Sequence, residues 1–515
     1  MSKAASPQDA AEPEGPPSDP APPSASSRPR LWVSTTYFAE GFPYSVVNNL
    51  AEILFTELGA GLRMIGLTAL FHLPWNLKFL WGPFVDRFET KRRWLLGVEV
   101  ALVLALVALA MLTTGGAVLS WIAAAFLLVA VLSATHDIAI DGFYLEGLDE
   151  QGQSRFIGYR AMAYKVASLL VRGPLIILIG VVGWTQGLLA TAVVMALVTA
   201  AHALILPRVE RRGRPLSRLV AAALRPRNLV VAALVAACAL AERQLDLVGP
   251  LWRALRAAVA ASPLLGNVSV AGWISMALLA TLMVLLLART RIRKRLSGSN
   301  HYYSRAFLDF LEQPRVAHIL AFVVLFRAGE SFLQKMKWPF LREHVELSLE
   351  QYGFANGTLG VLASFAGTLV GGWLIARHGL RRWIWPFVIA QNLLNLLYVG
   401  LAALARDGGV PLTMVTSVIT VEHFGEGLGT AVFMVYLMRC CDPAHKAAHM
   451  AILTALMSVS FTLAGVVSGF LAEAWGFGPY FAFCFAATFP GMVLIPWLPY
   501  LDGRRVAAPA GRAPS

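Results

Sequence analysis

The stretch Gly82 to Trp94, G-P-F-V-D-R-F-E-T-K-R-R-W, places one acid and a basic cluster in a short turn between two long apolar runs. Its glycine lets two helices approach closely, and Asp86 can meet the N-terminal dipole of a neighbouring helix or pair with an arginine. A degenerate copy, G-W-L-I-A-R-H-G-L-R-R-W, recurs at residues 372–383, with Ala376 in the place of the acid. The repetition indicates that the chain consists of two related halves.

The composition is typical of a membrane protein that crosses the bilayer many times. Of the 515 residues, 57% are hydrophobic and 14% are charged, and the mean hydropathy is +0.63, which is too apolar for a soluble globular chain. The formal net charge of +13 does not indicate nucleic-acid binding, because the basic residues fall mainly in short segments between apolar runs, as cytoplasmic loops require. The four cysteines show neither disulfide nor zinc-ligand spacing, and we expect no cofactor and no metal.

Twelve apolar runs are long enough to cross a hydrocarbon layer of about 30 Å, which takes about 20 residues, and they fall into two sets of six. We expect an all-α fold with spans at residues 31–53, 64–84, 95–113, 117–141, 157–180 and 184–206, and again at 316–338, 356–376, 383–404, 411–438, 447–471 and 478–498. An inserted pair at 229–241 and 268–288 would raise the count to 14. The run 229–241 is short enough to lie at the membrane interface instead.

These spans divide the chain into five parts. They are a disordered Pro-, Ala- and Ser-rich tail (1–30), a six-helix bundle (31–206), a basic linker with the inserted helices (207–315), a second six-helix bundle (316–500) and a short tail (501–515). Arg and Lys gather after the second, eighth and twelfth core spans, whereas the opposite loops carry almost none. By the positive-inside rule, both termini are expected in the cytoplasm.

Carboxyl groups interrupt the apolar runs in two places that resemble each other. In the stretch Ser133 to Glu146, S-A-T-H-D-I-A-I-D-G-F-Y-L-E, Asp137 and Asp141 are four residues apart and share one helix face. Glu422 and Glu426 repeat this spacing in the second half. A charged side chain at the centre of a membrane helix costs roughly 2.5–3.5 kcal/mol on insertion scales, so such residues usually face a bundle interior or a water-filled cavity. These acids are therefore candidate functional residues.

The turn at residues 82–94 resembles the G-x-x-x-D-R-x-x-x-x-R-R loop of the major facilitator superfamily. Further stretches resemble the AmpG muropeptide permease family of that superfamily: Lys78–Phe88, Ser133–Gly142, Gly158–Arg160, Phe326–Phe332 and Gly425–Phe433. The aspartate stretch is also similar to the acetyl-coenzyme A transporter family. The resemblance implies proton-driven uptake of anhydromuropeptides by alternating access across a bacterial inner membrane, and we expect a monomer.

In this superfamily the turn is a conformational latch, and the first, fourth, seventh and tenth core helices line a central cavity. The acids of the apolar runs sort onto those four helices. A carboxyl group that is partly removed from water holds a proton more readily, so it can take one up and release it near neutral pH. We therefore expect proton coupling by Glu40, Asp137, Glu330, Glu422 and Glu426, and gating by Asp86, Arg87, Arg92, Arg93, Arg377, Arg381 and the pair of Asp141 with Arg160.

Basic side chains in the same segments could bind the carboxylates of an anionic sugar-peptide. Lys165 and Arg172 are seven residues apart on one face of the fifth span, and arginine suits bidentate carboxylate recognition. The alternative is that these cations only neutralise nearby acids, as Arg327 could do for Glu330 three residues later. The candidates for substrate binding are Lys165, Arg172, Arg327, Lys335 and His423, whereas Lys78 is expected to pair or snorkel within the bundle.

Two other functions fit part of this pattern. The acids do not specify the solute, so the chain could carry another anionic solute, an acyl-coenzyme A or a drug. A membrane phosphotransferase that uses Asp137 and Asp141 on a metal is disfavoured, because the sequence has no D-G-x-x-A-R spacing around these acids, no H-E-x-x-H and no phosphate-binding glycine loop. We therefore expect a transporter and not an enzyme, with a small anionic solute, protons and the lipid bilayer as partners and no nucleic acid.

Overall fold

The computed structural model describes residues 28–116, 118–208, 302–407, 409–442 and 445–502, with isolated positions between 209 and 301. Every regular element in these ranges is a helix, which confirms the predicted all-α fold. The predicted inserted spans at 229–241 and 268–288 lie outside the described residues, as do nearly all of the two predicted tails.

Ten helical stretches of the described residues are long and apolar enough to cross a membrane. They are Lys91–Leu112, Leu119–Gly147, Arg155–Val182, Trp184–Ile205, Val316–Glu343, Leu349–His378, Leu380–Arg406, Leu412–Cys440, Ala448–Trp475 and Phe477–Trp497. Two further spans, over residues 29–57 and 62–87, are built from shorter helices. The described residues therefore contain a counterpart of each of the twelve predicted core spans.

The first part of the chain forms six spans, of which the first two are interrupted. The elements are α1 (Pro29–Ser45), η1 (Val46–Leu50), α2 (Ala51–Glu57), α3 (Leu62–Leu67), η2 (Thr68–His72), α4 (Leu73–Leu77), η3 (Lys78–Leu80), α5 (Gly82–Arg87), α6 (Lys91–Leu112), α7 (Leu119–Gly147), α8 (Glu150–Leu170), η4 (Val171–Leu175), α9 (Ile176–Val182) and α10 (Trp184–Ile205).

The second part follows the same order of spans after one amphipathic helix, α16 (Tyr302–Leu311). Its elements are α17 (Val316–Leu325), α18 (Ala328–Glu343), α19 (Leu349–Tyr352), η5 (Gly353–Gly360), α20 (Val361–His378), α21 (Leu380–Leu393), α22 (Leu396–Asp407), α23 (Leu412–Cys440), α24 (Lys446–Trp475), α25 (Phe477–Ala486), α26 (Phe489–Leu494) and η6 (Ile495–Trp497).

Proline and glycine explain the broken second span. Pro74 and Pro83 lie in the first turns of α4 and α5, where a proline without a backbone N–H is tolerated, whereas it would interrupt the ladder of one long helix. The chain between them passes through the short 3₁₀ turn η3, which begins at Lys78. The break places Lys78 on a local turn rather than on a regular helix face.

Three other spans contain π-helical segments, namely η1, η4 and η5. Such segments are rare and often occur at functional sites, because the extra residue changes the direction of the following side chains. Residues of all three segments line the central cavity described below, among them Asn48, Arg172 and Asn356. The irregular backbone therefore concentrates around this cavity.

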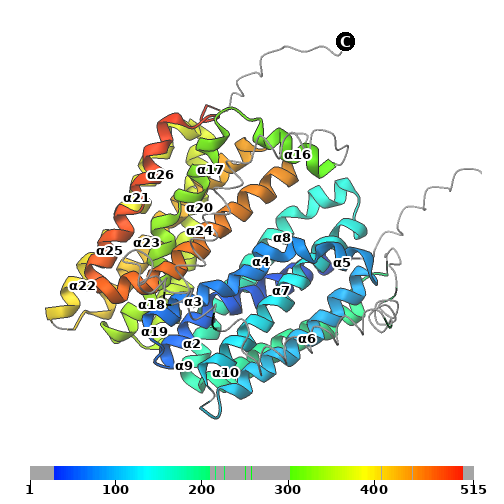
Figure 1. The fold of residues 1–515 in the computed structure, drawn as a ribbon, viewed down its shortest axis with the longest axis horizontal. Coiled ribbons are helices and arrows are strands. Elements are labelled where there is room, and N and C mark those ends of the chain that lie inside the picture. Colours follow the sequence, from blue (N-terminus) through cyan, green and yellow to red (C-terminus); the bar gives the residue numbers. More distant parts are fainter. Residues whose placement is uncertain are drawn as a thin grey trace, which may run out of the picture.

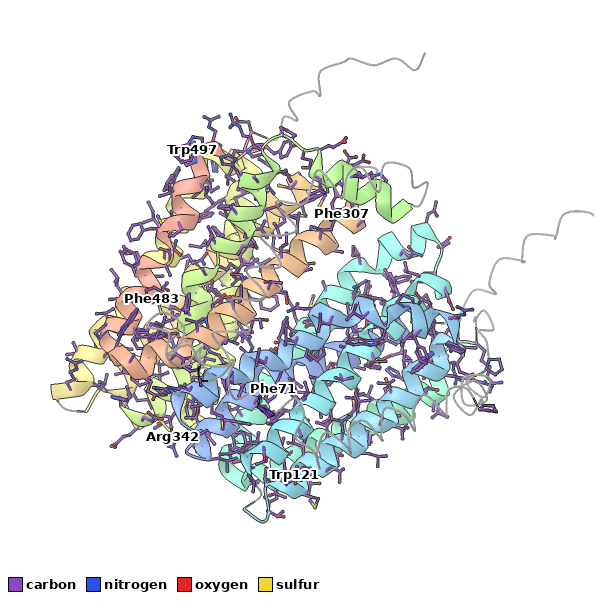
Figure 2. All side chains as sticks on the ribbon, viewed as in Figure 1. Phe71, Trp121, Phe307, Arg342, Phe483 and Trp497 are labelled. Carbon is purple, nitrogen blue, oxygen red and sulfur yellow. The ribbon has the colours of Figure 1, made fainter. Side chains whose placement is uncertain are left out.

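The two parts of the chain form two groups of helices, coloured blue to cyan-green and green to red in Figure 1. We name the ends of the molecule after two residues labelled in Figure 2: the Arg342 end, where α2, α3, α18 and α19 lie together, and the Trp497 end. At the Arg342 end, α2 packs on α18 and α3 packs on α24. One apolar cluster there includes Phe55 of the first group and Phe340 of the second.

Candidate functional site

A cavity of about 860 Å³ lies between the two groups of helices and is lined by residues of both. This volume is within the range of small-molecule sites, about 300–1,000 Å³. The charged side chains of the lining are Glu40, Glu52, Lys78, Asp137, Asp141, Arg160, Arg172, Arg327, Glu330, Lys335 and Glu426. So many charges, on spans that cross an apolar layer, fit a polar, charged solute.

The first group of helices contributes three carboxyl groups, which we call the three-carboxyl cluster: Glu40 of α1 with Asp137 and Asp141 of α7. One oxygen of each lies within 4.8 Å of the others. The Nζ atom of Lys78 lies 2.5 Å from Asp137 Oδ2, and a guanidinium nitrogen of Arg160 lies 2.9 Å from Asp141 Oδ1. The three acids therefore have two ion-pair partners among the described residues, which leaves one acid in excess.

The predicted pairing of Asp141 with Arg160 is thus present in the structure. The Tyr37 hydroxyl also donates a hydrogen bond of 2.9 Å to Asp141 Oδ1, and the Arg160 guanidinium carbon lies 4.3 Å from the centre of the Tyr37 ring. The Oε2 atom of Glu40 is buried and has no hydrogen-bond partner among the described residues. Glu40 is therefore the member of the cluster with room for a proton or a solute hydroxyl.

The second group contributes the Arg327 cluster, in which one arginine bridges two glutamates. A guanidinium nitrogen of Arg327 lies 2.7 Å from Glu330 Oε1 and 3.0 Å from Glu426 Oε1. The Gln391 amide donates a 2.8 Å hydrogen bond to Glu330 Oε2, so this residue of the ninth core span joins helices. As in the first group, the described cluster holds one more acid than cation.

Glu422 lies apart from these clusters and is 2% exposed. Its carboxylate is 2.9 Å from Lys337 Nζ and 2.8 Å from His423 Nδ1, and the Gln334 amide donates a 3.2 Å hydrogen bond to it. Neither Glu422 nor His423 belongs to the cavity lining. The structure therefore places Glu422 as the centre of a buried, neutralised network on α18 and α23.

The candidate cations for substrate binding differ in their surroundings. Lys335 lines the cavity and is 3.1 Å from Glu52 and 2.6 Å from the Thr68 hydroxyl. Arg172 also lines the cavity, whereas Lys165 does not and lies 4.4 Å from the centre of the Phe365 ring. The two residues that share a face of the predicted span therefore reach different surroundings.

Three ion pairs join described residues of the two groups, and all three lie toward the Arg342 end. They are Lys335 with Glu52 at 3.1 Å, Arg342 with Glu57 at 2.8 Å and Arg63 with Glu473 at 3.0 Å. The Ser458 hydroxyl adds hydrogen bonds of 2.5 Å to His72 and to Asn76. These ion pairs and hydrogen bonds hold the two groups of helices together at the Arg342 end.

Glycines allow the backbones of the two groups to touch near that end. A Cβ atom at Gly357 would overlap the carbonyl oxygen of Arg172, and one at Gly469 would overlap that of Leu62. Because these neighbours are backbone atoms, no side-chain rotation can relieve the overlap. Small residues at membrane helix contacts permit such close approach.

Replacing Gly357 with alanine is expected to prevent this close contact and to shift the molecule away from the closed Arg342 end. Spin labels at Leu58 and Glu346, both exposed near that end, should report a longer distance in the variant. The matched control is Gly372→Ala on the same span, because a Cβ atom there meets open space. An unchanged distance in Gly357→Ala would show that the contact does not hold the end closed.

The turn at residues 82–94 makes its contacts mainly within its own group. Asp86 pairs with Lys91, which also donates a 3.1 Å hydrogen bond to the Val85 carbonyl. Arg92 donates to the carbonyl of Ala203 at 3.0 Å, and Arg93 is 2.7 Å from Glu89. The ion-pair partner of Asp86 is therefore a lysine and not the predicted arginine. Because Lys91 is the first residue of α6, Asp86 also lies near the N-terminus of that helix, as the other predicted alternative requires.

The other predicted gating residues lie in exposed positions. Arg87 is exposed on α5, and the guanidinium of Arg377 lies 5.6 Å from the centre of the Trp373 ring. Arg381 is 2.6 Å from Asp502 near the C-terminal end of the described chain. Exposed pairs of this kind contribute about 0–1 kcal/mol each, so they could exchange partners when the molecule changes conformation.

A fully buried hydrogen-bonded group, which the sequence did not reveal, lies within the first group of helices. Glu99 of α6 is 3.2 Å from His136 Nε2 of α7 and 2.6 Å from His202 Nδ1 of α10, and all three side chains have zero exposure. His136 directly precedes Asp137 in the chain. This triad therefore ties three helices together behind the cavity wall.

Replacing Glu99 with alanine is expected to destabilise the protein by about 3 kcal/mol or more, because two buried imidazoles lose their shared partner. Thermal unfolding in detergent would measure this, with Arg381→Gln as the control that removes only an exposed pair. A Glu99→Ala variant as stable as the control would contradict the structural role of the triad.

Two further charged residues, the partly buried Glu52 and the buried Lys337, were not predicted from the sequence. Both lie close to an end of a predicted span, at 31–53 and 316–338, where a charge is ordinarily attributed to the membrane interface. The available signal was their position on the first and seventh core spans, which also carry Glu40 and Glu330.

Comparison with known proteins agrees with this architecture. The sequence profile of the Major Facilitator Superfamily matches residues 320–514. The anhydromuropeptide permease of Escherichia coli K12 is 26% identical over 465 residues, which cover 89% of this chain and 77% of the permease. The putative transporter AmpG 4 of Rickettsia conorii is 21% identical over 473 residues, which cover 89% of this chain and 93% of that protein.

Solved structures of peptide transporters share the fold. The POT family transporter PepTSo has a TM-score of 0.63 at 14% identity and covers 93% of this chain and 98% of its own. A peptide transporter POT in complex with sulfate has a TM-score of 0.60 at 16% identity and covers 92% and 95%. These relatives are permeases and transporters, which agrees with the prediction of a transporter rather than an enzyme. The chain is a multi-pass membrane transporter with the fold of the major facilitator superfamily, and its sequence resembles those of the AmpG anhydromuropeptide permeases.

Proposed function

We propose that the protein is a proton-coupled transporter that imports anhydromuropeptides, or similar anionic sugar-peptides, across the bacterial inner membrane. One observation carries this proposal: each group of helices presents to a single cavity a cluster with one more acid than cation. In the three-carboxyl cluster three acids share Lys78 and Arg160, and in the Arg327 cluster two acids share one arginine.

An excess carboxyl group in such a cluster is a natural place for a proton. Like charges held within a few ångströms disfavour each other's ionised form, so one proton stabilises the group. Binding that proton also lowers the negative charge that an anionic solute meets in the cavity. We assign coupling to Glu40 and Asp137 in the first group and to Glu330 and Glu426 in the second, whereas Glu422 holds α23 to α18 through Lys337.

Alternating access accounts for the asymmetry of the two ends. If both termini are cytoplasmic, the Arg342 end faces the periplasm and the structure corresponds to a state closed on that side. Opening it breaks three ion pairs, of which the pair of Lys335 with Glu52 is the most buried, and separates Gly357 from Arg172. The charged groups of the opposite end, including Asp86, Arg87, Arg381 and the pair of Asp141 with Arg160, then serve as the latch.

Two kinds of observation support the proposed solute. Permeases named for anhydromuropeptides are similar to this chain over most of its length, and the cavity combines cations, acids, amides and aromatic rings, as a charged sugar derivative requires. This combination favours an anionic sugar-peptide over a purely apolar drug.

Proton flux in proteoliposomes tests the proposal. Addition of GlcNAc-anhydroMurNAc outside vesicles that contain the purified protein should raise the external pH, because protons enter with the solute. Protein-free vesicles give the baseline. Solute entry without any pH change would refute proton coupling, and a pH change only with simple peptides would refute the sugar-peptide solute.

A further inference from the structure

Among the lysine and arginine side chains of the cavity lining, Arg172 is the one that forms no direct ion pair with a described carboxylate, although its charge acts over a longer distance on Glu52 and Glu426. The other four lysine and arginine side chains of the lining each form an ion pair with a carboxylate: Lys78, Arg160, Arg327 and Lys335. The side chain of Arg172 forms no ion pair or hydrogen bond with a described residue, and its Nε atom is buried without a hydrogen-bond partner. A buried polar group without a partner is costly, so this guanidinium is suited to a ligand.

The backbone holds Arg172 firmly in place. The residue lies in the π-helical segment η4, between α8 and α9 and directly before Gly173 and Pro174. Its carbonyl oxygen packs against Gly357 of η5, which belongs to the other group of helices. The close backbone contact fixes the position of the residue, and its side chain lines the cavity.

Aromatic rings of the first group line the same cavity, and we call them the aromatic wall: Tyr44, His72, Trp75 and Tyr164. The ring centres of Tyr44 and Trp75 are 5.0 Å apart, those of Tyr44 and Tyr164 are 5.7 Å apart, and those of His72 and Trp75 are 5.6 Å apart. Tyr164 precedes Arg172 by eight residues on one span, which is about 12 Å at 1.5 Å per residue.

We propose that Arg172 binds the carboxylate of the transported solute while a ring of that solute lies against the aromatic wall. The inference rests on the proposed function and narrows it: the solute carries a free carboxylate within about 12 Å of a ring. Arginine presents two parallel N–H groups to a carboxylate. Because Arg172 also forms part of the contact between η4 and η5, the bound anion lies beside the surfaces that must separate during transport.

A first experiment tests the anion site without any assumption about the solute. Millimolar sulfate is titrated into the purified protein in detergent, and thermal unfolding reports binding. Sulfate should stabilise the wild-type protein, and Arg172→Gln should need at least about tenfold more sulfate, since hydrogen bonds to charged groups have this strength. The control is Arg155→Gln, an exposed arginine of α8 outside the lining. Equal responses of Arg172→Gln and wild type would overturn the proposal.

A second experiment tests the carboxylate itself. Unlabelled GlcNAc-anhydroMurNAc and its methyl ester compete for binding of the labelled sugar to wild type, Arg172→Gln and Arg172→Lys. Wild type should prefer the free acid at least about tenfold, Arg172→Gln should lose this preference, and Arg172→Lys should recover part of it. Full preference in Arg172→Gln would overturn the proposal. An Arg172-dependent response to sulfate with no binding of either sugar would support the anion site and reject the proposed solute.

Discussion

Replacing Glu426 with glutamine is expected to abolish accumulation of the solute against its gradient while leaving exchange of solute across the membrane. Arg327 pairs with both Glu330 and Glu426, so one cation faces two carboxylates. When one of the two carboxyl groups binds a proton, the charges of the cluster balance. Glutamine fixes one of the two side chains in a neutral form. The cavity can still open and close, but the proton no longer moves with the solute.

The size of the effect follows from the gradient. If one proton accompanies a singly charged anion, each pH unit of gradient supports roughly tenfold accumulation, because a pH unit is worth about 1.4 kcal/mol. The Glu426→Gln variant should therefore fall from about tenfold accumulation to none in vesicles with a gradient of one pH unit. Exchange of labelled for unlabelled solute is the companion measurement, and Glu346→Gln, an exposed acid, is the control. Full accumulation by Glu426→Gln would exclude this residue from coupling.

Replacing Asp137 with asparagine is expected to lower uptake by about tenfold or more and to flatten its pH dependence. The variant leaves two acids for Lys78 and Arg160, so the three-carboxyl cluster no longer has an acid in excess. Without that excess, repulsion between carboxylates no longer favours the binding of a proton to the cluster. Initial uptake rates measured between about pH 5.5 and 8 would reveal the change.

The conservative variant separates charge from geometry in this cluster. Asp137→Glu keeps the carboxylate and should retain the pH dependence even if its rate is lower, because the longer side chain can still reach Lys78. An Asp137→Asn variant with the pH profile of the wild type would show that the three-carboxyl cluster does not couple transport to protons.

The fold could be predicted from the sequence because apolar runs of membrane length can be recognised without any knowledge of tertiary contacts. The acids could also be placed on the cavity-lining spans, and Asp141 could be paired with Arg160, since the resemblance to known permeases supplies the arrangement of spans. In the structure all of these acids except Glu422 line the cavity, and Asp141 pairs with Arg160 and also accepts a hydrogen bond from Tyr37.

Other features could not be predicted, for definite physical reasons. The pairing of Lys335 with Glu52 joins residues far apart in the chain, and no local spacing indicates it. The π-helical segment η4 carries no periodic sequence signal, yet it separates the surroundings of Arg172 from those of Lys165. The triad of Glu99, His136 and His202 depends on how three helices pack. In the sequence Glu99 and His202 are isolated polar residues, and His136 stands beside Asp137 with no sign of a distant partner.

The most direct test of the central claim is uptake of radiolabelled GlcNAc-anhydroMurNAc into right-side-out and everted membrane vesicles that carry the protein, with and without a proton gradient. The account predicts accumulation in right-side-out vesicles that depends on an inward proton gradient and disappears in Glu426→Gln. Accumulation that ignores the gradient, or no uptake by a correctly inserted wild-type protein, would contradict it.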